Sequence, residues 1–305
     1  MSNGWAGRRT ALTVTLLILT AVAVGYTAGL LLRPAALLRI TFLDVGQGDS
    51  AVIESPDGKT MVLDTGRSSE VSSRGRSTVL PFLRTRGVNT INALILTHWD
   101  SDHAGGAVAL LSDIRVRHLI VQPEGPWSRQ RSATETEVRA TAARRRLPLL
   151  TPYEGDAIQL GSQLELKVLN PPRPQDRFAP RTDNDASLVM LLRYGKARVM
   201  FTADASAEAE HRIARAHADV RADILKVAHH GSASGTSDRW LDAVRPKVAI
   251  ISVGRNNPFG HPDARVLTRL KRRGVRILRT DEDGAVTVVS DGREYRIRRY
   301  RRANN

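Results

Sequence analysis

The stretch THWDSDHAGG, residues 97–106, places two imidazoles and two carboxylates within six positions: His98, Asp100, Asp102 and His103. Alternate residues of an extended segment project to the same side, so the first three can face one point, and His103 follows at once. Imidazole and carboxylate groups are ligands for zinc, manganese or iron. Bound cations would offset the repulsion between the aspartates. The spacing therefore predicts a metal site that takes four ligands from one loop and has room for two ions; a solvated polar loop is the alternative.

The composition limits the other kinds of chemistry. The chain has no cysteine, which excludes thiolate metal sites, disulfides and a cysteine nucleophile. Its 305 residues are 41% hydrophobic, enough for one large domain or two smaller ones with a substantial core. The formal net charge of +15 favours a polyanionic partner such as nucleic acid, anionic lipid or cell-wall polymer. A coding bias towards arginine is the alternative explanation of that charge.

The elements that must position this loop alternate between short apolar runs and helical patterns from residue 38 onwards. The run INALILT, residues 91–97, is typical of a buried strand and leads directly into the loop. Each other polar candidate also follows a strand, which predicts a layered α/β domain with its site on one rim. We expect strands at 39–45, 50–54, 60–64, 91–97, 164–169, 187–192, 197–202, 223–228 and 248–252, helices at 78–86, 104–111, 133–146, 206–218, 237–244 and 263–272, and a final β-hairpin.

The N-terminus has a different character. Residues 10–32 carry no charge, lie between Arg8-Arg9 and Arg33, and are numerous enough to cross a bilayer. We predict that residues 1–33 form a single-pass anchor in the cell membrane, with the body of the chain outside the cytoplasm. A cleaved signal peptide is an alternative, because Ala21-Val22-Ala23 has a small-x-small pattern. A buried helix of a soluble fold is another.

The pattern HxDxDH followed by Gly-Gly, after an apolar strand, resembles the second motif of the metallo-β-lactamase superfamily. Further motifs resemble the hydrolase domain of the ComEC family, the DNA-uptake channels of bacterial competence, over residues 38–290. The channel helices of that family have no counterpart here. The motifs are FLDVGQGDS (42–50), VLDTG (62–66), KVAHHGS (226–232) and NPFGHP (257–262).

This resemblance implies an αββα sandwich with a dinuclear site at one edge. We therefore expect a hydrolase domain at residues 38–298 and a basic tail at 299–305. It also implies two divalent ions, zinc or manganese, as cofactors. The implied ligands are His98 and Asp100 for the first ion, Asp102, His103 and His261 for the second, and Asp204 between the two.

Other residues are assigned around the ligands by the same resemblance. Asp64 would hold a metal ligand in position without binding the metal itself. One of His229 and His230 would contact a substrate phosphate or protonate the leaving oxygen, and we favour His230. The catalytic set is then His230, His229 and Asp102, and the surrounding set is Asp64, Asp44, Gln47, Asp49, Asn184 and Ser187, with an ordinary strand start as the alternative for Ser187.

Three positions depart from the pattern of the superfamily. Asp100 replaces a histidine that is common in the wider superfamily, a replacement that ComEC-like proteins share. Ala203 replaces the glycine that usually precedes the bridging aspartate, Asp204. Asp263 replaces a second histidine that the family usually shows after the proline that follows His261. None of the principal ligand positions is lost.

Together these features predict a metal-dependent phosphodiesterase or nuclease that hydrolyses DNA at the cell envelope with a metal-activated water. The expected partners are DNA, the membrane, and competence or envelope machinery. The alternatives are hydrolysis of another phosphodiester, in lipid or cell-wall polymer, and a non-catalytic DNA-binding component. The candidate nucleic-acid contacts are Arg144, Arg145, Arg146, Arg298 and Arg299, with Tyr295 and Tyr300 as possible base-stacking groups; a solvated edge strand is the alternative for this terminal segment.

Overall fold

The computed structural model describes residues 15, 18–24, 37–68, 73–125, 127, 131–174 and 180–300. The chain divides into two compact units, residues 1–36 and residues 37–305. The predicted anchor lies mostly outside the described residues, of which 15 and 18–24 are helical. Among the residues described, no helix is long and apolar enough to span a bilayer. The predicted tail also lies partly outside them, beyond residue 300.

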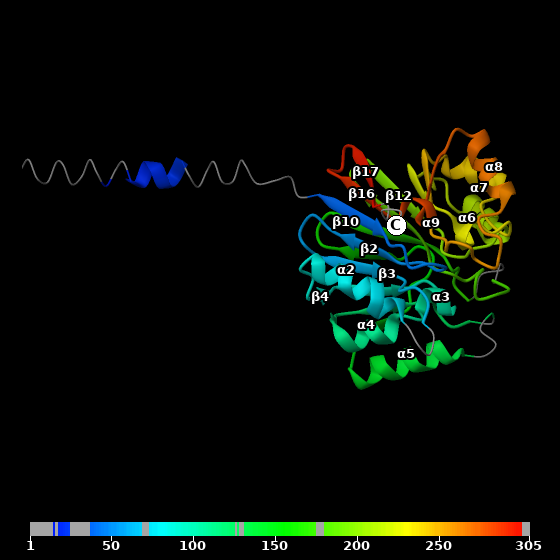
Figure 1. Ribbon diagram of the computed structural model, residues 1–305, viewed down its shortest axis with the longest axis horizontal. Coiled ribbons are helices and arrows are strands. Elements are labelled where there is room, and N and C mark those ends of the chain that lie inside the picture. Colours follow the sequence, from blue (N-terminus) through cyan, green and yellow to red (C-terminus); the bar gives the residue numbers. More distant parts are fainter. Residues whose placement is uncertain are drawn as a thin grey trace, which may run out of the picture. The chain divides into compact units, whose positions relative to one another are not determined.

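Two mixed β-sheets form the centre of the second unit (Figure 1). In spatial order the first contains β17 (Tyr295–Tyr300), β16 (Ala285–Ser290), β1 (Leu38–Phe42), β2 (Ala51–Glu54), β3 (Thr60–Leu63), β5 (Ala93–Leu96), β7 (Leu119–Val121) and β8 (Leu149–Leu150). The second contains β15 (Arg276–Arg279), β14 (Val248–Ile251), β13 (Ile224–Lys226), β12 (Ala197–Phe201), β11 (Val189–Tyr194), β10 (Leu164–Asn170) and β9 (Ala157–Leu160).

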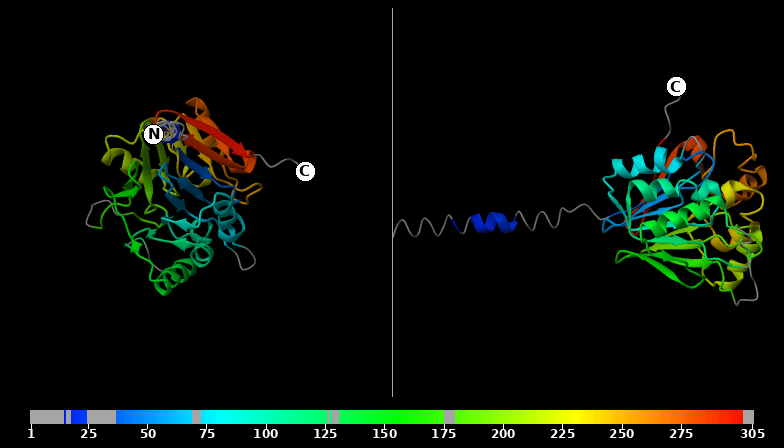
Figure 2. Two further views of the ribbon diagram at one scale, coloured as in Figure 1. Left: turned by 90° about the vertical axis from the view of Figure 1, so that its left-hand side faces the viewer. Right: turned by 90° about the horizontal axis from the view of Figure 1, so that it is seen from below.

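Helices cover the outer faces of both sheets (Figures 1 and 2). One apolar cluster lies between the sheets, a second joins the first sheet to its helices, and a third joins the second sheet to its helices. This is the predicted αββα order of layers. Every residue of the three clusters lies between Leu38 and Val288, so residues 37–305 contain their own core. The helices are α2 (Leu80–Thr85), α4 (Ala107–Asp113) and α5 (Ala133–Arg144) on the first sheet, and α6 (Ala207–Ala216), α7 (Asp238–Val244) and α8 (Ala264–Arg272) on the second.

Strand direction determines where the loops gather. In the first sheet β1, β3, β5, β7 and β8 all run the same way, and in the second β12 to β15 are parallel. Parallel strands place their carboxyl ends on one edge of a sheet. We call the edge at these carboxyl ends the site rim, and the edge at their amino ends the opposite rim.

Two predicted elements are divided in the structure. Asn92 interrupts the predicted strand 91–97, because its side chain accepts a hydrogen bond from Thr60 N at 3.0 Å and β4 (Thr90–Ile91) pairs instead with β6 (Arg115–Val116). Gly105-Gly106 separates α3 (Ser101–Ala104) from α4, and a Cβ on Gly106 would lie 2.5 Å from Thr65 O. At the far end, β17 continues two residues past the predicted domain boundary at 298.

Candidate metal centre

The centre is built around the carboxylate of Asp204, which follows β12 and is buried. Its Oδ1 lies 3.2 Å from His103 Nε2. Its Oδ2 lies 3.9 Å from His98 Nε2 and 3.8 Å from His230 Nε2. Asp102 closes the ring, with Oδ2 3.3 Å from His230 Nε2. Three segments that are distant in sequence thus bring the imidazole Nε2 atoms and two carboxylates to one point on the site rim.

Several buried atoms at this point lie near oppositely charged groups but form no hydrogen bond among the described residues. The Nε2 atoms of His98, His103 and His230 and the Oδ1 atom of Asp204 are buried and have no hydrogen-bond partner among the described residues. Buried polar atoms are nearly always hydrogen-bonded, so several orphans in one place require an explanation. Three imidazole nitrogens and a carboxylate oxygen are the donor set of a divalent cation. The described residues of this centre therefore fit metal ions, with His98, His103 and Asp204 as the tightest group.

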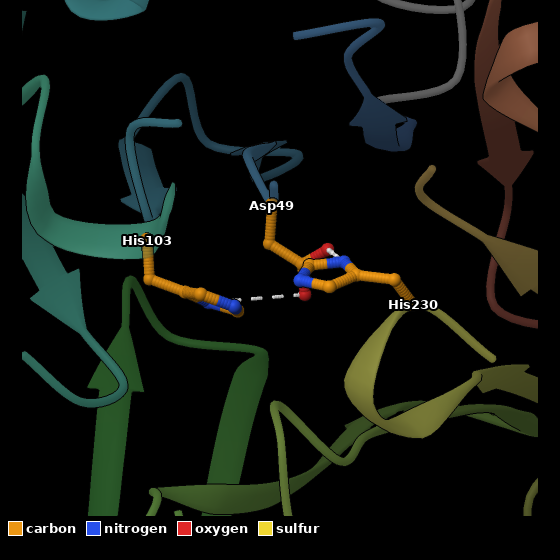
Figure 3. A group of neighbouring side chains, drawn as sticks. All are labelled: Asp49, His103 and His230. Atoms are coloured by element: carbon orange, nitrogen blue, oxygen red, sulfur yellow. Dashed lines mark ion pairs between the residues drawn. The ribbon is translucent and has the colours of Figure 1, made fainter. Parts of the chain in front are cut away.

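Asp49, His103 and His230 form a second group of neighbouring side chains (Figure 3). The Asp49 carboxylate is 3.3 Å from His230 Nδ1 and 4.0 Å from His103 Nδ1. It also lies 2.7 Å from the ammonium of Lys226, a residue buried at the end of β13. His230 Nδ1 is in addition 3.0 Å from Ser252 O. The ammonium of Lys226 already compensates the charge of Asp49, so this group is suited to hold the two histidines in position through their Nδ1 atoms. A cation fits on the Nε2 side of the same rings.

Asp64 fixes the orientation of His103. Its carboxylate accepts hydrogen bonds from Thr97 N at 2.8 Å and Thr97 Oγ1 at 2.7 Å, and it lies 2.9 Å from His103 Nδ1. A carboxylate on Nδ1 keeps the proton there and leaves Nε2 free to bind a metal. Thr97 Oγ1 also lies 3.1 Å from His98 Nδ1, so one threonine connects both histidines of the loop to Asp64.

The electrostatics of the cluster favour charged groups. Burial opposes protonation of His103, yet Asp204 and Asp64 raise its pKa well above the usual value. Burial likewise opposes protonation of His230, but Asp204, Asp49 and Asp102 raise its pKa to about 9. Burial also opposes ionisation of Asp204, but His103 and His230 hold its pKa well below the usual value. Without metal, His103 and His230 therefore carry protons that compensate the carboxylates, and metal binding must displace those protons.

These shifts predict how the stability of the metal-free domain depends on pH. The raised pKa of His230 contributes stability that is complete below pH 6.5 and is lost as the pH rises towards about 9. We expect the free energy of unfolding of chelator-treated domain to fall by on the order of 2–3 kcal/mol across that window. Urea titrations at several pH values measure this. Excess zinc should reverse the trend, because metal binding needs neutral imidazoles; a metal-free stability that rises from pH 6.5 to 9 would contradict it.

Two predicted ligands lie further out. The side chain of Asp100 is 54% exposed, with Oδ2 3.5 Å from His98 Nε2. His261 belongs to neither ligand group. Its ring centroid is 5.8 Å from that of His229 and 6.5 Å from that of His230, and Asn257 holds its backbone N–H and C=O. His230 lies closer to the carboxylates of the centre than His261 does, and His261 as a ligand stays a prediction.

His229 and His230 differ in exposure. Both have positive φ angles, of 48° and 52°, so the turn η2 (Ala228–Gly231) directs them differently. The His230 side chain is 2% exposed and faces Asp102, whereas the His229 side chain is 32% exposed with Nε2 3.5 Å from Asp204 Oδ2. Burial therefore favours His230 as a ligand and His229 as the group that meets substrate.

The early loop packs directly on the metal-binding loop. Asp49 N donates to Asp102 O at 3.1 Å, and a Cβ on Gly48, where φ is +133°, would lie 2.3 Å from the same oxygen. Gln47 Oε1 accepts from Gly254 N at 3.1 Å, which ties this loop to the segment after β14. Asp44 accepts from Gly46 N and so orders its own loop.

Asn184 and Ser187 approach the site from the other sheet. Asn184 is half-buried, and its carbonyl oxygen accepts from Ser187 N at 3.1 Å. Ser187 is fully buried, its Oγ has no hydrogen-bond partner among the described residues, and the next amide, Leu188 N, donates to Thr97 O at 2.9 Å. Ser187 thus lies beside the first residues of the metal-binding loop.

The predicted nucleic-acid contacts are not at this site. Arg144 ends α5, and Arg145 and Arg146 precede β8, so all three lie at the opposite rim. Arg298 and Arg299 lie in the edge strand β17, and Arg299 is paired with Asp283 at 2.9 Å. The structure brings His98, Asp102, His103 and Asp204 together but does not bring these arginines to them.

Sequence reasoning missed three residues at the site. Lys226 supports Asp49, Thr97 connects Asp64 to both histidines, and Phe259 is 55% exposed with its ring stacked 5.7 Å from that of His261. A signal for Lys226 was present, because a lysine ends the otherwise apolar strand ILK just before two histidines. No comparable signal marks the threonine.

The family model described as the metallo-beta-lactamase superfamily matches residues 43–255. ComE operon protein 3 of Bacillus subtilis is 34% identical over 259 residues, which are 81% of this chain and 32% of the relative. Recombination protein 2 of Haemophilus influenzae is 35% identical over 250 residues, 82% of this chain and 28% of the relative. The chain thus spans about a third of the length of these curated relatives.

One solved structure supports the fold alone. Igni18, a metallo hydrolase from the archaeon Ignicoccus hospitalis, superposes with a TM-score of 0.51 at 12% sequence identity, over 82% of this chain and 98% of that one. Because the identity is so low, this likeness concerns only the arrangement of sheets and helices.

Proposed function

Because the chain belongs to the metallo-β-lactamase superfamily, whose fold it carries, we propose that it is a metal-dependent phosphodiesterase that cleaves DNA. The observation that carries the proposal is the set of buried, unpartnered ligand atoms around Asp204. The relatives named for competence and recombination favour a nucleic-acid substrate, as does the net charge of +15.

We infer that the centre holds two divalent ions, zinc or manganese. When bound, such ions supply a water that is acidic near neutral pH and positive charge for the phosphoryl oxygens. Asp204 is suited to lie between them because each of its oxygens faces different histidines. The proposed ligands are His98 and Asp100 on one side, Asp102 and His103 on the other, and His230 or His261 as the late histidine.

The residues around the ligands then have separate tasks. Asp64 keeps the Nδ1 proton of His103 in place, and Ser252 O, with the Asp49 carboxylate 3.3 Å away, does the same for His230. His229 is exposed to solvent, and Ser234 Oγ lies 3.2 Å from its Nδ1, so its Nε2 can give a proton to a leaving oxygen at the mouth of the site. Phe259 offers an exposed aromatic face at the same mouth, on which a nucleobase can stack.

We also propose that residues 10–32 anchor the protein in the cell membrane with the hydrolase domain outside the cytoplasm, where it would act with competence or envelope machinery. Support comes from the uncharged length of that segment and from relatives that include Competence protein ComA of Neisseria gonorrhoeae.

Degradation of DNA by residues 37–305 tests the activity directly. Single- and double-stranded DNA should be cleaved with manganese or zinc, and we expect Asp102→Ala to lower the rate at least about a hundredfold, because it removes a ligand beside His230. Asp219→Ala, an exposed carboxylate paired with Arg198, is the matched control and should keep the wild-type rate. Metal bound near two ions per chain without cleavage of either DNA would refute the nuclease assignment and direct the search to lipid and cell-wall phosphodiesters.

A further inference from the structure

Four arginines line a cleft at the opposite rim. Arg115 and Arg117 precede β7, and Arg145 and Arg146 precede β8, so both pairs lie where these parallel strands begin. The cleft between them has a volume of about 690 Å³ and is closed on its inner side by Leu111, Ile114 and other apolar groups.

The positive charge of this cleft is not compensated. All four arginines are exposed, and within the described part of the chain none of them forms an ion pair; Arg145 donates only to Ser112 O, at 2.8 Å. The acid in the cleft, Asp113, is paired with Arg76 at 2.9 Å. Guanidinium groups bind phosphate oxygens through paired hydrogen bonds, so free arginines around one cleft suit phosphate groups.

The basic surface continues to the start of the domain. Arg117 also lines a cleft of about 530 Å³ with Lys59 and His118, and another of about 480 Å³ with Leu37 and Arg39. Leu37 is the first residue of this domain unit, and it precedes β1. The chain therefore enters the domain at the opposite rim, while the metal ligands follow the other ends of the same strands.

The connection to the apolar N-terminal segment is short. Four residues, 33–36, separate it from Leu37, and four residues span at most about 14 Å. This step rests on the proposed anchor: with residues 10–32 in a bilayer, that length is the longest reach from the anchor to Leu37.

We propose that the opposite rim binds anionic phospholipid headgroups and thereby turns the metal centre away from the membrane. Juxtamembrane arginines are attracted to anionic lipid surfaces. The arginine cleft lies at the opposite ends of the strands from the metal centre, and β5 alone spans about 13 Å. The orientation leaves the site rim open to a long polymer.

Vesicle binding by residues 37–305, which contain the whole apolar core, tests the surface without the anchor. We expect cosedimentation with vesicles of equal parts phosphatidylglycerol and phosphatidylcholine at low salt, little with phosphatidylcholine alone, and release at high salt. Joint replacement of Arg115, Arg117, Arg145 and Arg146 by glutamine should weaken binding at least about tenfold. The matched control replaces four exposed arginines of the site rim, Arg67, Arg239, Arg255 and Arg265, with the same loss of charge, and should bind nearly as the wild type.

Three results would overturn the proposal: equal loss in both quadruple variants, retention in both, or binding of a DNA oligonucleotide but not of vesicles that depends on the opposite-rim arginines. Thermal unfolding of each variant checks that it is folded. Manganese-dependent DNA cleavage by the opposite-rim variant separates this inference from the proposed activity. If the protein binds vesicles but no variant cleaves DNA, the proposed nuclease activity is wrong and the lipid-binding surface stands. If the protein cleaves DNA but does not bind vesicles, the lipid-binding surface is wrong and the nuclease activity stands.

Discussion

Asp204→Asn should remove bound divalent metal and lower DNA cleavage by roughly a thousandfold or more. Among the described residues, Asp204 is the one carboxylate that faces three buried imidazole Nε2 atoms, at 3.2 to 3.9 Å. Asparagine keeps the shape of the side chain but loses the negative charge that offsets two neighbouring cations. The effect should therefore exceed that of removing any single histidine, whose place another ligand or a water can take.

Metal content after dialysis, measured by elemental analysis, should fall from about two ions per chain to one or none in Asp204→Asn. Cleavage is measured on the same preparations at saturating manganese. Asp219→Asn makes the same chemical change at an exposed carboxylate, so this variant should keep the wild-type metal content and cleavage rate. An Asp204→Asn protein with full metal content and full activity would show that the ligand atoms gather there for another reason.

Lys226→Met is expected to destabilise the domain by about 3–5 kcal/mol. Lys226 is buried beneath the metal centre, 2.7 Å from the Asp49 carboxylate, and its ammonium also donates to Val227 O at 2.9 Å. Methionine fills a similar volume but leaves Asp49 as a buried carboxylate without its strongest cation. Because Asp49 also orients His230, we expect metal affinity to fall about 10- to 100-fold as well.

Urea unfolding of the metal-free domain measures this loss, and the double variant Asp49→Asn/Lys226→Met tests its cause. If the uncompensated charge is responsible, the double variant should be more stable than Lys226→Met alone. Lys247→Met is the matched control: Lys247 pairs with Asp223 at 2.8 Å, but its side chain is 72% exposed, so we expect a change within about 0.5 kcal/mol. Similar losses in both lysine variants would argue against a special role for the buried pair.

Elements with strong local signals were predictable. The hairpin expected to turn at Tyr194-Gly195 is present as β11 and β12, and Gly195 has the positive φ that such a turn needs. Helix α7 begins after Ser237, whose side chain accepts from Trp240 N, as expected for an N-cap. The short strands β7 and β8 carry too few residues for a pattern and exist because neighbouring strands pair with them.

By itself the sequence determined the groups that act at the metal centre, because their spacing within single loops and their positions after apolar strands are local properties. His98, Asp102 and His103 come from one turn, and any fold that extends the preceding strand brings them together. Only the tertiary structure decided which distant groups complete the site. The contact of Asp49 with Lys226, the burial of His230 beside an exposed His229, and the placement of the arginines on the opposite rim all depend on how two sheets stack and which way their strands run. Those relations join segments that no local spacing connects.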